Sequence, residues 1–126
     1  MTLNDIITEV DDQKPNQYDD ADKIRWISKC EGKIVDSVFL THTNPPVTEF
    51  DGYTSADMDT ELLIPDTYAD VYKYYLFAMI DATNGELKRY EGSMQLFNSM
   101  LMDFTDFYNR THTPLKRPLK IFKGGK

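Results

Sequence analysis

Residues 87–108 read LKRYEGSMQLFNSMLMDFTDFY, and the spacing of the large apolar side chains in this stretch decides the fold that we expect. Alternate steps of three and four residues separate seven of these side chains, which places them on one stripe of an α-helix, as in a heptad repeat. The stretch therefore predicts one long helix with a continuous packing seam. The seam consists of Leu87, Tyr90, Met94, Phe97, Leu101, Phe104 and Tyr108.

A second helix is expected just before this one, beginning at Pro65–Asp66 and separated from it by Asn84–Gly85. A short connection of this kind favours two long helices packed antiparallel. The earlier helix carries more aromatic side chains than one core can bury, because four tyrosines and a phenylalanine between positions 68 and 77 point to more than one side. The excess predicts a subunit or partner contact that includes Tyr74, Phe77 and Ile80.

Two further helices are expected at the N-terminal end. Thr2 with Asp5 forms a weak capping box before an apolar face, and Lys14-Pro15-Asn16 ends this first helix. The acidic run DDAD at 19–22 suits the start of a second helix, which we expect to reach about Thr41.

Residues 42–62 show neither a helical nor an alternating pattern, so they predict a loop long enough to be either functional or disordered. The expected fold is therefore all-α: a small helical bundle with two long antiparallel helices, two N-terminal helices, the 42–62 loop and an extended C-terminal arm.

The C-terminal arm is predicted from its charge and its prolines. Residues 110–126 hold six Lys or Arg and no Asp or Glu, whereas residues 1–109 carry a net charge of −13, within a total of −7. Pro114 and Pro118 oppose a helix there. We therefore divide the chain into a helical domain, 1–112, and a basic arm, 113–126. The residues expected to bind a partner are Arg110, Lys116, Arg117, Leu119, Lys120, Ile121, Phe122 and Lys123.

No group of residues in the sequence makes a convincing catalytic, cofactor or metal site. The carboxylates Asp57, Asp59 and Glu61 are spaced as in a calcium loop, but the glycine that should follow them is Leu62. His42 and His112 lack the further ligands that zinc needs, and Cys30 has no neighbour that would activate a thiolate. We expect a solvated acidic loop, a buried cysteine, no enzymatic activity and no cofactor.

The chain resembles the head-tail connector proteins, or head completion adaptors, of long-tailed bacteriophages and of prophages of Gram-positive bacteria. Three stretches carry the resemblance: EVDDQKPNQYDDADKIRWISKCEGKI at 9–34, TELLIPDTYADVYKYYLFAMID at 60–81 and YEGSMQLFNSMLMDFTDFYNRTH at 90–112. They occur in order within residues 3–112, and none of them is diagnostic alone.

The resemblance implies a viral structural protein without enzymatic activity, located at the head-tail interface of the virion and made in the cytoplasm of the bacterial host. Such proteins dock as a ring, commonly dodecameric, beneath the portal protein, and offer a surface to the next connector, a stopper or a tail protein. DNA would pass through the ring without specific binding. Asp57, Asp59 and Glu61 would then border the channel, where like charge repels phosphate.

Two other functions remain open from the sequence. The basic arm could clamp DNA phosphates in a small packaging or regulatory factor, although Leu119, Ile121 and Phe122 are better suited to a protein contact. A metal-dependent enzyme built on the 57–61 carboxylates is the weakest of the three readings, since no base or nucleophile accompanies them. No signal peptide or membrane-spanning run is evident, so we expect a cytosolic product without a membrane partner.

Overall fold

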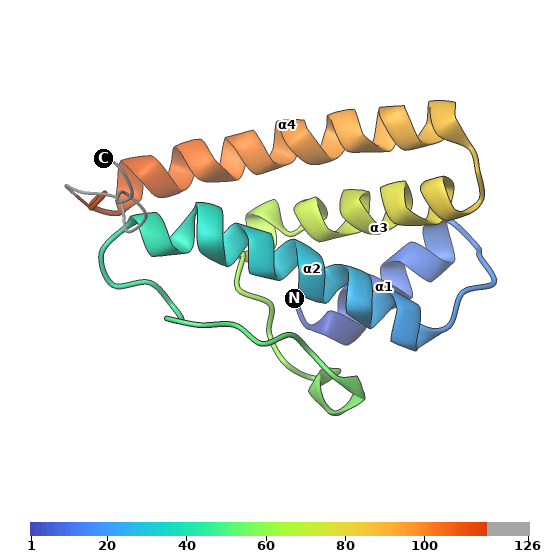
Figure 1. Cartoon of the computed structure of the whole chain (residues 1–126), viewed down its shortest axis with the longest axis horizontal. Helices are drawn as coiled ribbons and strands as arrows, with labels where there is room; N and C mark the ends of the chain where they lie inside the picture. The colour runs from blue at the N-terminus through green and yellow to red at the C-terminus, as the bar shows by residue number, and fades with distance from the viewer. Residues whose placement is uncertain (116–126) are drawn as a thin grey trace, which may run out of the picture.

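The structure, a computed structural model, describes residues 1–115 of the chain (Figure 1). Within these residues helices account for all regular secondary structure, apart from two isolated bridges, which confirms the predicted all-α class. The α-helices are α1 (Leu3–Gln13), α2 (Asp20–Ser37), α3 (Asp70–Thr83) and α4 (Leu87–Thr111), and the short 3-10 helices are η1 (Phe39–Thr41), η2 (Ser55–Asp57) and η3 (Asp66–Tyr68).

The ends of α1 follow the predicted signals. The Asp5 backbone N–H donates to Thr2 Oγ1 at 3.0 Å, and the Thr2 N–H donates to the Asp5 carboxylate at 2.9 Å, which completes the capping box. The backbone bond to Thr2 is the main cause that lowers the pKa of Asp5 below its ordinary value. At the other end Lys14 caps the helix immediately before Pro15, as predicted.

The second helix ends earlier than the predicted Thr41. At its end, side chains contact the carbonyl of Val38, which in a longer helix would accept from a backbone N–H. α2 stops at Ser37 and continues as the single turn η1. The carbonyl of Val38 accepts from Thr41 Oγ1 at 2.7 Å and lies 2.8 Å from His42 Nδ1. A helix carbonyl satisfied in this way needs no further turn of helix.

Figure 1 shows α3 and α4 lying side by side and joined by a tight turn, so that they run in opposite directions. Gly85 in the turn has φ +77°, a conformation that favours glycine. Near the turn the buried Asp81 ties three helices together. Its carboxylate lies 2.8 Å from Lys14 Nζ, at the end of α1, and accepts from Ser93 Oγ of α4 at 3.1 Å.

The buried carboxylate of Glu31 on α2 joins the helices to the 42–62 loop. It accepts hydrogen bonds from the Tyr72 hydroxyl at 2.6 Å, the Tyr53 hydroxyl at 2.8 Å and the Leu63 backbone N–H at 3.0 Å. The Tyr72 oxygen in turn accepts from the Ile64 N–H at 2.9 Å. Burial raises the pKa of Glu31 above its ordinary value of 4.5, although all three hydrogen bonds oppose the shift.

The 42–62 loop is held against the start of α1 by its backbone. The Leu3 N–H donates to the Thr60 carbonyl at 3.0 Å, and the Asn4 N–H donates to the Met58 carbonyl at 2.9 Å. The Tyr53 N–H donates to Ser28 Oγ of α2 at 2.8 Å. Of the two possibilities that the sequence leaves open for this loop, these contacts favour an ordered one.

We predict that Glu31→Gln destabilises the fold by about 1–3 kcal/mol, because the amide nitrogen cannot accept from the donors that meet at this position. Chemical denaturation at pH 7 would measure the loss. Glu49→Gln is the matched control, since Glu49 is exposed, and should change stability by no more than about 0.5 kcal/mol. Equal effects of the two substitutions would contradict the central role of Glu31.

The raised pKa of Glu31 also predicts a pH dependence. A carboxyl whose pKa is higher in the folded state than in the unfolded state contributes stability that is complete below about pH 4.5 and is lost as pH rises through the folded pKa. The difference in unfolding free energy between wild type and Glu31→Gln should therefore shrink as pH rises from 4.5. Denaturation series across this range would reveal the trend, and a difference that grows with pH would contradict it.

Candidate interaction surfaces

The apolar seam of α4 is buried only towards its C-terminal end. Phe104 and Tyr108 are 0% and 5% exposed, whereas Leu87, the first seam residue, is 69% exposed. Outside the seam, Leu96 and Met102 are 51% and 65% exposed. The expectation of a continuous core seam is thus wrong for the N-terminal part of α4. The reason is geometric: α4 packs mainly along α3, and α2 does not close against it.

Three residues of α3 were predicted to form a partner surface, and the prediction is wrong for Ile80. It is 1% exposed and belongs to the core, because the first two helices cover that side of α3. Tyr74 and Phe77 are half-buried, with their ring centroids 6.2 Å apart. Lys14 Nζ lies 5.5 Å from the centre of the Phe77 ring. The surface available on α3 is therefore smaller than the sequence predicts.

An apolar hollow lies between α2 and α4, and we call it the α2–α4 groove. Its volume is about 430 Å³. The buried side chains Cys30, Ile34 and Tyr75 lie at its base. The full lining is Cys30, Lys33, Ile34, Asp36, Ser37, Tyr75, Met94, Phe97 and Leu101. A shallower hollow beside Leu101 and Met102 continues along α4.

The thiol of Cys30 does not make this groove reactive. The side chain is 1% exposed, and desolvation raises the pKa of the thiol well above its ordinary value. Because the thiolate is the reactive form, a buried thiol with a raised pKa is a packing group. This agrees with the expected buried cysteine.

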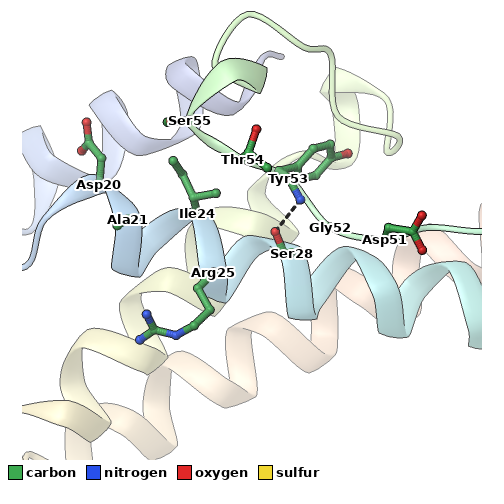
Figure 2. Close-up of a pocket in the computed structure, with 10 residues that line it drawn as sticks. All are labelled: Asp20, Ala21, Ile24, Arg25, Ser28, Asp51, Gly52, Tyr53, Thr54 and Ser55. Carbon is green, nitrogen blue, oxygen red and sulfur yellow. Dashed lines mark hydrogen bonds between the residues drawn. The ribbon is translucent and has the colours of Figure 1, made fainter.

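A second pocket, of about 420 Å³, lies between the first half of α2 and residues 51–55 (Figure 2). Figure 2 shows Asp20, Arg25 and Asp51 pointing in different directions around it. Arg25 pairs instead with Asp22 on its own helix, at 3.0 Å. The charged groups of this pocket therefore do not converge on one position where a ligand would be held.

The three loop carboxylates do not converge on one position either. Asp57 accepts from the Thr54 N–H at 2.7 Å and so completes the capping box of η2, while Glu61 lies 3.0 Å from the Met1 amine. Asp59 is exposed. Within residues 1–115 no three His, Cys, Asp or Glu side chains gather in a way that could hold a metal ion.

The two histidines, far apart in sequence, meet at Tyr108. The His42 ring lies edge-on to Tyr108 with centroids 4.7 Å apart, and the His112 ring stacks on it at 3.8 Å. His42 Nε2 also lies 2.8 Å from Asn109 Oδ1. This aromatic cluster fastens the end of α4 to the end of α2, and no spacing in the sequence indicated that His42 would meet Tyr108.

The first residues of the predicted arm are joined to the helical domain. The Leu115 N–H donates to the Thr41 carbonyl at 3.0 Å, and the Thr43 N–H donates to the Thr113 carbonyl at 2.9 Å. Arg110 lies exposed in the last turn of α4. The other predicted arm residues, Lys116, Arg117, Leu119, Lys120, Ile121, Phe122 and Lys123, lie outside the described residues.

No family model matches the chain, and neither a curated protein nor a solved structure matches it. Among the helices of residues 1–115, none combines the length and the apolar character needed to cross a membrane.

Because α4 is buried unevenly, replacing its apolar side chains by alanine should reduce the stability of the fold by different amounts along the helix. Phe104→Ala should destabilise the fold by about 3–5 kcal/mol, because it leaves a cavity in the core. Leu96→Ala, in the same helix but half exposed, should cost less than about 1 kcal/mol. Thermal and chemical denaturation of both variants would test the contrast, and similar losses would mean that α4 is buried along its whole length.

Proposed function

We propose that this chain is a viral structural protein, a head-tail connector that docks as a ring beneath the portal, completes the head and joins it to the tail. It works by binding other proteins. Its partners are the portal protein, neighbouring copies in a ring of dodecameric symmetry, and the next connector, stopper or tail protein. Its place is the head-tail interface of the virion, after synthesis in the bacterial cytoplasm.

The observation that carries the proposal is the apolar surface that α4 leaves uncovered. Leu87, Leu96 and Met102 are each more than half exposed, and the α2–α4 groove lies along the same helix. Apolar surface that a chain does not cover itself is typical of a protein that binds other chains. On α3 the half-buried Tyr74 and Phe77 provide a second contact, since aromatic residues are enriched in interfaces.

The resemblance to connector proteins adds support from the sequence. Its three stretches, 9–34, 60–81 and 90–112, supply most of α2, α3 and α4. They include Glu31 and two of its donors, Leu63 and Tyr72. The matched residues are thus those around which this helical domain is organised.

The division of charge suits a ring around DNA. Residues 1–109 carry −13, and in a ring the fields of the subunits add. Asp57, Asp59 and Glu61 border the channel in this proposal. Asp57 and Glu61 also have local partners, so Asp59 is the carboxylate that can be changed with the least effect on the loop.

The arm reaches a neighbouring connector subunit or the portal in the assembled ring. Its Lys and Arg residues are attracted to acidic surfaces, but exposed ion pairs contribute only about 0–1 kcal/mol each. The apolar residues Leu119, Ile121 and Phe122 supply most of the affinity, at roughly 1.5–3 kcal/mol for each one that is fully buried.

A small DNA-binding packaging or regulatory factor is the second candidate, and the charge of +6 on residues 110–126 is what favours it. In that case the arm would contact phosphates, and affinity for DNA would fall steeply as salt rises.

Attachment to heads separates the two candidates. The full chain should cosediment with DNA-filled, portal-bearing heads isolated from a mutant phage that lacks this gene. Ile121→Ser with Phe122→Ser should weaken attachment by at least about 100-fold, from the loss of two buried anchors. Lys116→Gln with Arg117→Gln should weaken it by less than about 30-fold.

Failure of the wild-type chain to bind such heads would contradict the connector proposal. Gel-shift assays at several salt concentrations provide the other arm of the test. Tight DNA binding that is lost with salt and with the Lys116→Gln, Arg117→Gln variant would favour the phosphate-binding factor.

A further inference from the structure

We propose that two copies of the free chain associate through α4, with the two α4 helices antiparallel and each lying along the α2–α4 groove of the other copy. The occupant of the groove is therefore a second copy of the same chain. The inference goes beyond the proposed connector function, because it concerns the free protein before any assembly on a head.

The groove offers a helix a place to pack. Its two sides are the helices α2 and α4, and the buried side chain of Tyr75 on α3 lies at its base. Figure 1 shows α4 along one edge of the helical domain. A helix of a second copy that lay against both α2 and α4 would cover the apolar side chains that they leave to solvent. In a symmetric pair the first copy does the same for the second.

The side of α4 next to the groove carries an apolar stripe. Leu87, Met94 and Leu101 are seven residues apart, which is about two turns of helix, so they lie on the same side of α4. Met94 and Leu101 line the groove, and Met102, which is 65% exposed, lines the shallower hollow that continues it. Packing the stripes of two copies together buries these side chains in both.

The charges of α4 favour the antiparallel arrangement. Lys88 lies nine residues before Phe97, and Asp106 lies nine residues after it. They share one side of the helix, since they are separated by about five turns. Both are exposed, and neither is ion-paired within residues 1–115. When Phe97 is level with its copy, Lys88 of each chain faces Asp106 of the other. A parallel pair would bring like charges together instead.

Polar residues of α4 match about the same centre. Gln95 and Ser99 lie two residues before and two residues after Phe97, and both are exposed. They lie seven residues from Lys88 and Asp106 respectively, so they are on the same side, and Gln95 of each copy faces Ser99 of the other. Asn98 lies next to the centre and beside the hollow, where its amide can both donate to and accept from its copy. A polar residue in an apolar seam fixes the register of two helices.

Charge reversal in the full chain tests the antiparallel contact. Sedimentation equilibrium should show dimers of the wild type with a dissociation constant in the micromolar range, because a contact built on one helix of each copy is at the small end of stable interfaces. Lys88→Glu and Asp106→Lys should each weaken dimerisation about three- to tenfold, since each change places like charges together twice. Both changes suit the helix dipole, and circular dichroism would check that the variants are folded.

An equimolar mixture of the two variants should recover an affinity within about threefold of the wild type, because the heterodimer restores both ion pairs. The two positions are about 27 Å apart on one helix, so contacts within a chain cannot produce this recovery. A mixture that binds no more tightly than either variant alone would overturn the inference. A wild type that stays monomeric at about 200 μM, or that forms assemblies larger than dimers, would overturn it as well.

The apolar contact has a matched pair of variants. Met102→Glu should weaken dimerisation at least about tenfold, because it places a charge in the contact. Leu96→Glu should change it less than about twofold, since Leu96, although 51% exposed, lines neither the groove nor the hollow beside it. Equal effects of the two substitutions would contradict the placement of the contact. None of these outcomes decides the connector proposal, which attachment to heads tests separately.

Discussion

The rest of the structure depends on the buried carboxylate of Glu31. Removing such a group from water is costly, and the cost is offset only where donors surround it. Here the donors come from α3, through Tyr72, from the middle of the long loop, through Tyr53, and from the segment that leads into η3, through Leu63. One side chain thus fixes how α3 and the loop lie against α2. The loop is held in place because its tyrosine satisfies a charge that the core would otherwise leave unpaired.

A consequence of this arrangement is that α4 is attached differently from the other helices. α1, α2 and α3 meet in the core around Glu31, and the ion pair between Lys14 and Asp81 links α1 to α3. α4 packs along α3, where Ser93 donates to the buried Asp81, and is fixed at its C-terminal end by Phe104 and by the rings around Tyr108. Between these attachments it stands away from α2, which creates the groove and leaves apolar side chains exposed. The groove and the exposed apolar side chains of α4, on which the proposed function rests, are therefore a consequence of how the other three helices pack together.

The sequence analysis predicted well wherever a signal was local. Thr2 with Asp5 started the first helix and Pro15 ended it, because capping and the restriction before proline act within a few residues. Periodicity similarly gave the all-α class. Periodicity also led to the wrong prediction that Ile80 lies on a partner surface. A helical pattern shows which residues share a face of the helix, but it does not show which faces other helices will cover. The same limit explains the α4 seam, which is regular along its whole length but meets a partner along only part of it.

By itself, then, the sequence determined the helices, the signals at the ends of α1, and the division between an acidic body and a basic C-terminal segment, because propensity, capping and charge belong to the residues themselves. Only the tertiary structure decided that Glu31 meets two tyrosines and a backbone amide, that two histidines flank Tyr108, and that α2 and α4 leave a groove between them. Except for His112, which stacks on Tyr108 four residues before it, these contacts join residues tens of positions apart. Neither periodicity nor a local motif in the sequence predicts such pairs. Their interaction energies arise only when packing has removed water and brought the partners together.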